Sequence, residues 1–341
     1  MRGSDSTPNA TTPSGAHRIR RIVSLAGITA LAACALATIP VGTPQASASQ
    51  DVRGGTGRDS TFGSTVGGAL TPQVPPTADR YWIAAADGGV FAFGGAQYFG
   101  SMAGQHLNSP VVGLAVDGPG FLAPSSLATR APAAGRGYWE VAGDGGIFAF
   151  GAAPFLGSMG GRHLNAPVVG MTVDPERGGY YEVAADGGVF AFGGASFLGS
   201  MAGQALAAPI VSITATPDGG GYWLVGADGG VFAYGDATFL GSLAGTGGTT
   251  VGLAAQGDGG YWLAKVNGHV HNYGTAGDEG SLPATPDAPV VGITSTGGQG
   301  YWLTSTDGGV FAFGGAGYSG GLAGRSLNAP VVGISALQLI A

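Results

Sequence analysis

Apolar and aromatic residues recur in a fixed order from Tyr81 to the end of the chain, in six similar units. Each unit opens on an aromatic-rich apolar run, passes through Asp-Gly-Gly or a related turn into a second apolar run, and later reaches a run such as Pro-Val-Val-Gly. Short runs of β-branched and aromatic residues bounded by glycine and proline predict β-strands. The pattern therefore predicts an all-β fold with units starting near Tyr81, Tyr138, Tyr180, Tyr222, Tyr261 and Tyr301.

The Asp-Gly pair between the first two runs of a unit predicts a β-hairpin with a two-residue type I′ turn. Placing Asp87-Gly88 in that turn pairs Trp82 with Phe93 and Ala84 with Phe91. Apolar side chains then occupy both faces of the hairpin, whereas a sheet with one solvated face alternates apolar and polar residues. The hairpins are therefore expected to be stacked between other sheets.

Strand-only units of about 40 residues that stack on both sides are typical of a β-propeller. The chain enters the first unit at its Tyr-Trp strand and leaves on residues 330–334, which match the strand that precedes Tyr-Trp elsewhere. We therefore predict six four-stranded blades over residues 80–341, closed by the C-terminal strand so that no sheet edge stays open. An open β-solenoid and a β-prism are the alternatives, and a strand recruited from the preceding linker would change the blade count.

Composition agrees with a folded, turn-rich chain. There are 69 glycines and 20 prolines, and 44% of the residues are hydrophobic, which distinguishes the chain from a disordered one. Only 10% are charged, with a net charge of −7, and Lys265 is the single lysine. Binding of nucleic acid requires clustered basic residues that neutralise phosphates, so a nucleic-acid partner is not expected.

The first 48 residues have the order of a secretory signal peptide: a basic segment at His17–Arg21, an apolar stretch at Ile22–Val41 and a small-residue cleavage site at Ala46–Ala48. Residues 49–79 are rich in Gly, Ser, Thr and Pro and predict a flexible linker. The expected location is therefore extracellular or at the cell surface. An uncleaved segment would instead anchor the chain in a membrane, and Leu31–Cys34 resembles a lipobox that would place a lipid on Cys34.

The units resemble the repeats of many secreted actinobacterial proteins, which have the form GYWLVAxDGGVFxFGxAxFxGS followed by LNAPVVG. The segments that match are Gly137–Ser158, Gly179–Ser200, Gly221–Ser242 and Leu164–Gly170. The resemblance implies an extracellular or cell-envelope module whose ligand is undefined. Unit five departs from the pattern, with Asn267-Gly268-His269 in place of Asp-Gly-Gly and His271 in place of Phe.

One acidic position recurs in five units and forms the candidate ligand-binding set of this sequence. A ring of such carboxylates could collect Ca²⁺ or sugar hydroxyl groups, although no cofactor is required by any motif. Aspartate before glycine is also what a tight turn favours, so a structural role is the competing interpretation. The five residues are Asp87, Asp144, Asp186, Asp228 and Asp307.

Other candidates are weaker. Glu140 and Glu182 replace Leu or Ile at one strand position, and paired carboxylates are what glycoside hydrolysis uses, but both could lie on a solvated part of the strand. His269 and His271 could offer metal nitrogens, and His106 and His163 lie in connecting loops. The tryptophans at one repeat position are expected in the core between blades: Trp82, Trp139, Trp223, Trp262 and Trp302.

No zinc-protease helix motif, phosphate-binding loop or cysteine pair is present in the sequence. We therefore expect a non-catalytic secreted or envelope module that binds or scaffolds a glycan, a cell wall or a protein. The alternatives are an extracellular hydrolase or lyase that uses Glu140 and Glu182, and a spacer held at the surface.

Overall fold

A computed structural model describes residues 79–118, 137–257 and 259–337. The signal peptide predicted over 1–48, Cys34 and the predicted linker up to residue 78 lie outside these residues. The described residues form 18 β-strands and no helix. Among them there is accordingly no helix long and apolar enough to cross a membrane. The predicted all-β class is confirmed.

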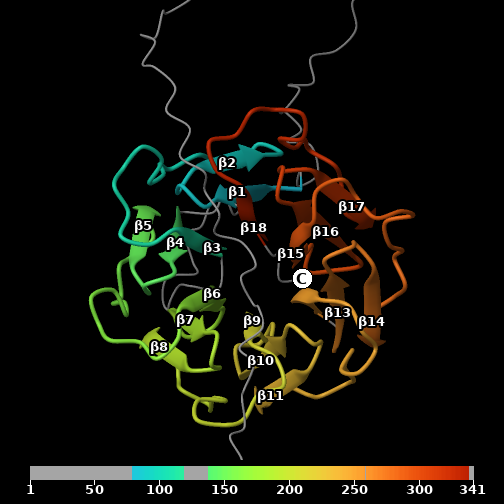
Figure 1. Ribbon diagram of the computed structural model, residues 1–341, viewed down its shortest axis with the longest axis horizontal. Helices are drawn as coiled ribbons and strands as arrows, with labels where there is room; N and C mark the ends of the chain where they lie inside the picture. Colours follow the sequence, from blue (N-terminus) through green and yellow to red (C-terminus); the bar gives the residue numbers. More distant parts are fainter. Residues whose placement is uncertain (1–78, 119–136, 258, 338–341) are drawn as a thin grey trace, which may run out of the picture. The chain divides into compact units, whose positions relative to one another are not determined.

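The strands form six three-stranded antiparallel sheets that surround a common centre (Figure 1). The inner strands are β3 (Val111–Val116), β6 (Val168–Asp174), β9 (Ile210–Ala215), β12 (Thr250–Gln256), β15 (Val290–Ser295) and β18 (Val331–Ala336). The central strands are β1 (Tyr81–Ala85), β4 (Gly137–Ala142), β7 (Gly179–Ala184), β10 (Gly221–Gly226), β13 (Gly260–Lys265) and β16 (Gly300–Ser305). The outer strands are β2 (Val90–Phe93), β5 (Ile147–Gly151), β8 (Val189–Gly193), β11 (Val231–Gly235), β14 (Val270–Gly274) and β17 (Val310–Gly314).

Five sheets consist of three consecutive strands, whereas the sixth joins the two ends of the repeat region in the order β18-β1-β2. Tyr81 pairs with Ala336 and Ile83 with Ile334, so the C-terminal strand stands where β3 or β6 stands in the next sheets. Each inner strand also contacts the inner strands of its two neighbours. The arrangement is that of a β-propeller-like repeat.

The hairpin register differs from the predicted one by one residue. Tyr81 pairs with Phe93 and Ile83 with Phe91, because the turn has three residues rather than two. Ala85 N donates to Gly89 O at 2.8 Å, and Gly88 N donates to Ala85 O at 2.9 Å. Gly88 has a φ of 78°, the left-handed conformation that completes a type I turn with a glycine bulge. The type I′ prediction was therefore wrong, since Ala86 joins Asp87 and Gly88 in the loop and Gly89 pairs with Ala85.

Each sheet packs on the next through an aromatic pair. In five sheets the tryptophan of the central strand lies against the tyrosine that opens the next one, as in Trp139–Tyr180 with ring centroids 5.5 Å apart, and in β7 Tyr181 takes its place against Tyr222. The last sheet meets the first in the same way, through Trp302 and Tyr81 at 5.4 Å. All five tryptophans are at most 5% exposed. The predicted role of the tryptophans as core residues is confirmed.

A fourth strand is absent from the described sheets. The segment that follows an outer strand forms backbone hydrogen bonds with a tyrosine side chain of the next sheet instead of with the outer strand. Phe99 N donates to the hydroxyl group of Tyr138 at 3.1 Å, and that hydroxyl donates to Gly100 O at 2.5 Å. Tyr180 and Tyr222 make the same two bonds to the segments before them. The outer segment is therefore held by side chains and not by a strand ladder.

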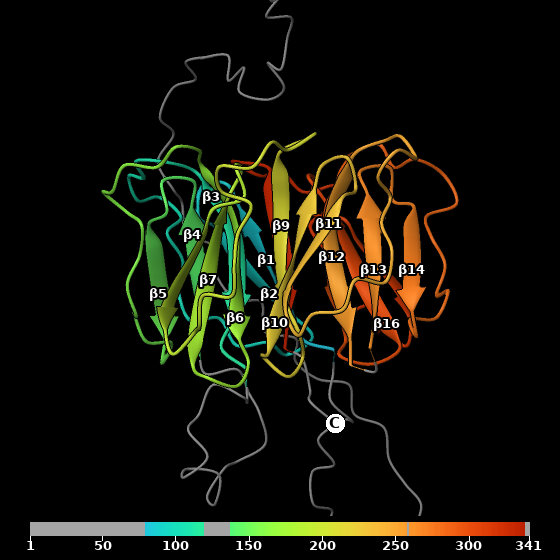
Figure 2. The ribbon, with the colours of Figure 1, turned by 90° about the horizontal axis from the view of Figure 1, so that it is seen from below.

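The turns and the long connections lie at one end of the sheets. Ala86 N donates to Pro330 O, and Val111 N donates to Ala86 O, so each turn touches the residues that lead into two inner strands. Met201 N likewise donates to Gly187 O. Figure 2 shows the strands side on, with their connections gathered at the two ends. We call the end that carries the Asp-Gly-Gly turns the hairpin face.

Candidate functional site

The five aspartates of the recurring acidic position each stabilise their own turn. Oδ1 of the aspartate accepts a hydrogen bond from the glycine N–H two residues later, at 3.0 Å in four turns and 3.1 Å in the turn of Asp307. The hydroxyl group of Ser305 also donates to Asp307 and lowers the pKa of that carboxyl. The set consists of Asp87, Asp144, Asp186, Asp228 and Asp307, and each member belongs to a different sheet.

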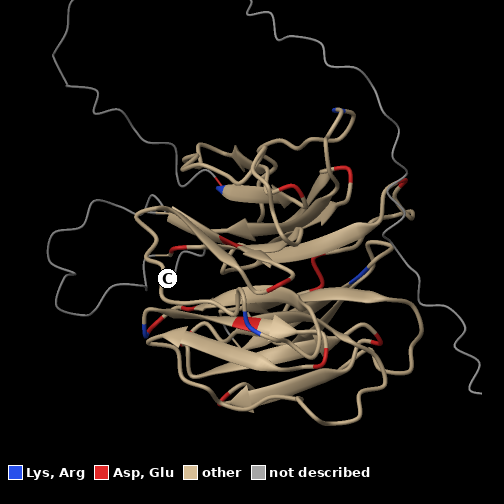
Figure 3. Ribbon diagram, turned by 60° about the vertical axis from the view of Figure 1, so that its left-hand side comes forward, with Lys and Arg blue, Asp and Glu red and all other residues tan. Residues whose placement is uncertain are grey.

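Within the part of the chain that the structure describes, no three His, Cys, Asp or Glu side chains lie close enough to hold a metal ion. The five aspartates therefore do not converge on a shared calcium site there. Contact of single aspartates with a ligand stays a prediction. Charged residues are sparse over the sheets, and most lie in turns and connections (Figure 3).

Glu140 and Glu182 are fully buried, so the interpretation that they lie on a solvated strand was wrong. Glu140 Oε2 accepts a hydrogen bond from Met102 N at 3.3 Å, while its Oε1 has no partner. Burial, with a smaller contribution from the neighbouring Asp87, raises the pKa of Glu140 to about 8. Burial and Asp144 act in the same way on the pKa of Glu182, which is also about 8.

The two carboxyl groups face the turn region of the preceding sheet. A Cβ atom on Gly145 would lie 2.9 Å from Glu182 Oε2. Since neither Glu140 nor Glu182 exposes any surface, a substrate has no access to them. They do not form an accessible acid–base pair of the kind that glycoside hydrolysis needs.

His269 and His271 are exposed and belong to the turn and the outer strand of the fifth unit. Asn267 Oδ1 accepts a hydrogen bond from His269 N, so asparagine takes over the turn role of aspartate here. Partial burial, Lys265 and His269 together lower the pKa of His271. The two imidazoles are not part of a three-residue metal cluster among the described residues.

Two grooves on the hairpin face bring polar side chains together. The first, of about 610 Å³, lies between units and is lined by Asp87, His106, Asn108 and Asn328 among others. The second, of about 270 Å³, belongs to the sheet β6-β7-β8 and is lined by His163, Asn165, Asp186 and Phe197 among others. The loop histidines of the sequence thus lie beside members of the acidic set.

Exposed aromatic rings recur on the outer segments and were not identified from the sequence. They are the first residue of each Phe-Leu-Gly-Ser motif or its variants, and 56–66% of their surface is exposed. The residue after each of the first four packs on the core, as Leu156 and Leu198 do. We call these five residues the aromatic belt: Tyr98, Phe155, Phe197, Phe239 and Tyr318.

A signal for the aromatic belt was present in the sequence. An aromatic residue recurs between glycine-rich turns, outside the two apolar runs that form the hairpin, and Asp278 replaces it in unit five. A position that tolerates aspartate in an otherwise strict repeat is more typical of a surface than of a core. Adjacent residues of an extended segment point to opposite sides, so burial of the following leucine leaves the aromatic ring in solvent.

The chain matches no protein-family model, and no curated protein matches it. The resemblance to actinobacterial repeats therefore stays a prediction that rests on the motif.

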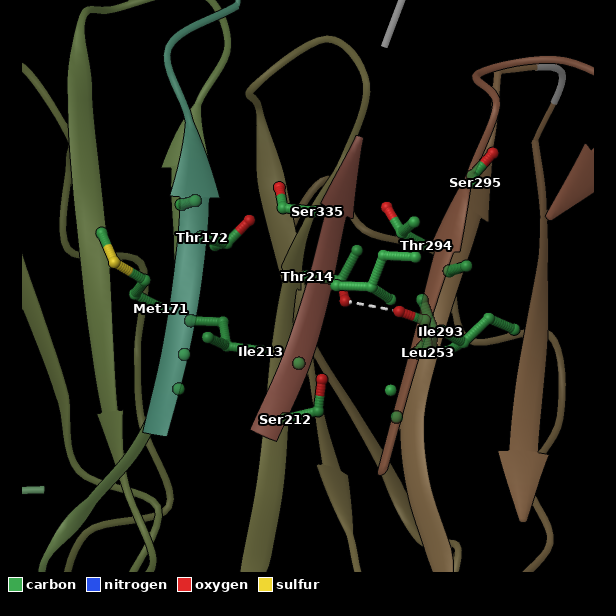
Figure 4. A pocket seen from close by; sticks show the side chains of 18 of the residues that line it. Met171, Thr172, Ser212, Ile213, Thr214, Leu253, Ile293, Thr294, Ser295 and Ser335 are labelled. Carbon is green, nitrogen blue, oxygen red and sulfur yellow. Dashed lines mark hydrogen bonds between the residues drawn. The ribbon is translucent and has the colours of Figure 1, made fainter. Parts of the chain in front are cut away.

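A central cavity of about 420 Å³ is lined by residues of the inner strands β3, β6, β9, β12, β15 and β18. Its lining side chains are mostly apolar, with a few hydroxyl groups, and Figure 4 shows Thr172, Thr294 and Ser335 directed into it. The hydroxyl group of Thr214 donates to Leu253 O at 2.9 Å and is used in joining two inner strands. No titratable side chain lines the cavity among the described residues, so that wall offers no group for acid–base chemistry.

Proposed function

We propose that the chain is a non-catalytic carbohydrate-binding module of the cell envelope. The observation that carries this proposal is the aromatic belt, a set of five large rings held in solvent at one repeat position in five units. Exposed apolar groups that fold stability does not require are typical of binding surfaces. Their recurrence indicates that the repeat itself presents the binding group.

Carbohydrate fits the belt better than a peptide or nucleic acid. A sugar ring has an apolar face of C–H groups, which packs on the electron-rich face of an aromatic ring, and a rim of hydroxyl groups. Polar side chains that accept or donate hydrogen bonds lie beside the ring of Phe197, in the groove with Asp186 and Asn165. The described part carries few basic residues, so an anionic polymer has little to bind to.

Repetition of the site suits a polymeric ligand. Single aromatic contacts are weak, but a glycan that reaches two or more of them binds with an avidity above that of each site. We propose that a closed six-bladed β-propeller provides the rigid frame for these sites. Pairing of β18 with β1 and packing of Trp302 on Tyr81 support this closure.

Binding of the full-length protein to isolated bacterial cell walls and insoluble polysaccharides tests the proposal. A triple variant with Phe155, Phe197 and Phe239 changed to Ala is expected to lose at least about tenfold in affinity, since each ring contributes about 1 kcal/mol. The matched triple variant with Trp at these positions keeps an aromatic face and should retain binding. The proposal is contradicted if the Ala variant binds as tightly as the unmodified protein, or if the unmodified protein does not bind at all.

A further inference from the structure

The groove of the sheet β6-β7-β8 has the chemistry of a subsite for a single sugar. It measures about 270 Å³, the size of a ring-sized group and not of a long segment. We propose that it binds one neutral hexose unit of a polysaccharide. This inference deepens the proposed function and rests on it.

Two aromatic residues line the groove. Phe197 from the aromatic belt, 61% exposed, lines the groove together with Phe190 of β8. An exposed ring beside an open groove offers its face to the C–H side of a sugar. Leu198, the next residue, packs on the core, and its N–H donates to the hydroxyl group of Tyr222 at 3.2 Å. The Phe197 ring is therefore mounted on a fixed backbone.

The lining also carries three kinds of polar group. Asp186 is oriented by the bond from Gly188 N to its Oδ1, and a carboxylate has capacity for further hydrogen bonds from ligand hydroxyls. His163 and Asn165 come from the loop before β6 and each can both donate and accept. Neighbouring hydroxyl groups of a sugar need such a mixture of donors and acceptors. A purely apolar ligand would leave these groups unused.

The charge of the groove selects against anionic ligands. Asp186 is the one carboxylate residue among its described lining, and no lysine or arginine lines it. A phosphate or a uronic acid would meet this carboxylate without a compensating cation. A neutral sugar meets no such repulsion.

The same four residue types recur in only one other unit. His106, Asn108, Asp144 and Phe155 occupy the matching repeat positions in the unit of β3-β4-β5. The unit of β9-β10-β11 keeps Asp228 and Phe239 but has Ala205 and Ala207 in place of the histidine and asparagine. It is therefore an internal control that has the aromatic ring and the turn carboxylate without the loop groups.

The test measures binding of the full-length protein to soluble neutral hexasaccharides of glucose, mannose and N-acetylglucosamine by isothermal titration calorimetry. Two double variants remove the loop and turn groups from both complete units: His106→Ala with His163→Ala, and Asp144→Asn with Asp186→Asn. Asparagine can still accept the turn hydrogen bond, so the second variant keeps the hairpin. The control is Asp228→Asn in the incomplete unit, which leaves the ring of Phe239 in place.

We expect each double variant to lower affinity for at least one hexasaccharide about tenfold, which corresponds to about 1.4 kcal/mol. The control should change it less than twofold. Unchanged binding by the histidine variant, or an equal loss in the control, overturns the subsite while binding by the aromatic belt stands. If the unmodified protein binds cell walls but no hexasaccharide, the subsite alone is overturned, and if it binds neither, the proposed function is overturned with it.

Discussion

At the scale of single residues, Glu140 and Glu182 are the least expected feature of the protein. They occupy a position filled by Leu224, Leu263 and Leu303 in later units, inside the packing between sheets. A buried carboxyl group without full hydrogen bonding is stable mainly in its neutral form. Stability of the fold is therefore linked to the protonation of these two side chains.

We predict that unfolding free energy falls as pH rises. The pKa of both carboxyls is raised from 4.5 to about 8 in the folded protein, so their neutral form carries no penalty below pH 4.5. Between pH 4.5 and 8 these carboxyls lose their protons in the unfolded chain but keep them in the folded protein. This difference lowers the free energy of unfolding by at most on the order of 5 kcal/mol per carboxyl at pH 8. Changing Glu140 and Glu182 to Leu should raise the melting temperature at pH 8 much more than at pH 4.

Thermal unfolding of the protein and of this double variant across pH 4–8 checks the prediction. The variant with Gln at both positions is the matched control, since it keeps size and hydrogen bonding but does not titrate. A stability difference that is the same at pH 4 and pH 8 would show that the two carboxyls are not the groups that link stability to pH.

At the scale of the elements, the Asp-Gly-Gly hairpin sets how each unit meets its own connection. Gly187 has a φ of 79°, and a Cβ atom there would lie 2.5 Å from the Cβ of Met201. Glycine is therefore required at this position for two reasons: the backbone is left-handed, and the following segment approaches too closely for a side chain. The hydrogen bond from Met201 N to Gly187 O holds the two segments together at this contact.

Gly187→Ala is predicted to destabilise the fold by about 2 to 5 kcal/mol, from backbone strain of about 1 to 2 kcal/mol and overpacking of about 1 to 3 kcal/mol. Gly203→Ala is the control, because Gly203 has a φ of 77° but no atom lies within 4 Å of its added Cβ. It should lose only the strain contribution. Urea unfolding measures both, and equal losses would mean that contact with Met201 does not restrict the turn.

At the scale of the whole molecule, the described sheet β18-β1-β2 depends on a strand from the far end of the chain. β18 contributes Val331, Ile334 and Ala336 to the cluster that also holds Tyr81 and Trp302. The first sheet therefore obtains its inner strand only after β18 has been synthesised. Contacts so distant in sequence form late and slowly in folding.

Removal of residues 331–341 is predicted to unfold the repeat region or to lower its stability by about 5 kcal/mol or more. Two large aliphatic side chains and an alanine leave the core, at about 1.5 to 3 kcal/mol for each large one, and the partner edge of β1 is exposed. Removal of residues 338–341 alone keeps β18 and is the control. Circular dichroism and limited proteolysis report the outcome, and a truncated protein with an unchanged melting temperature contradicts the role of β18.

Export is a second prediction at this scale, and it concerns residues outside the described ranges. In a bacterial secretion host, cleavage after Ala48 should release a protein that begins at Ser49 into the medium. Mass spectrometry of the N-terminus checks this, with Cys34→Ser as the matched variant. A membrane-bound form that begins at Cys34, and is lost in Cys34→Ser, would establish the lipidated alternative.

The sequence by itself determined the strands, the six units, the tryptophan core and the strand that returns to the first sheet. These features depend on local propensity and on apolar patterning, which each unit repeats. Only the tertiary structure decided the turn register, the missing fourth strand, the burial of Glu140 and the exposure of Phe197. Each of these depends on a neighbouring segment: the tyrosine hydroxyl of the next sheet replaces a strand ladder, and the preceding sheet covers the glutamate. A linear pattern specifies a strand, but the contact with the adjacent unit decides which side chains water reaches.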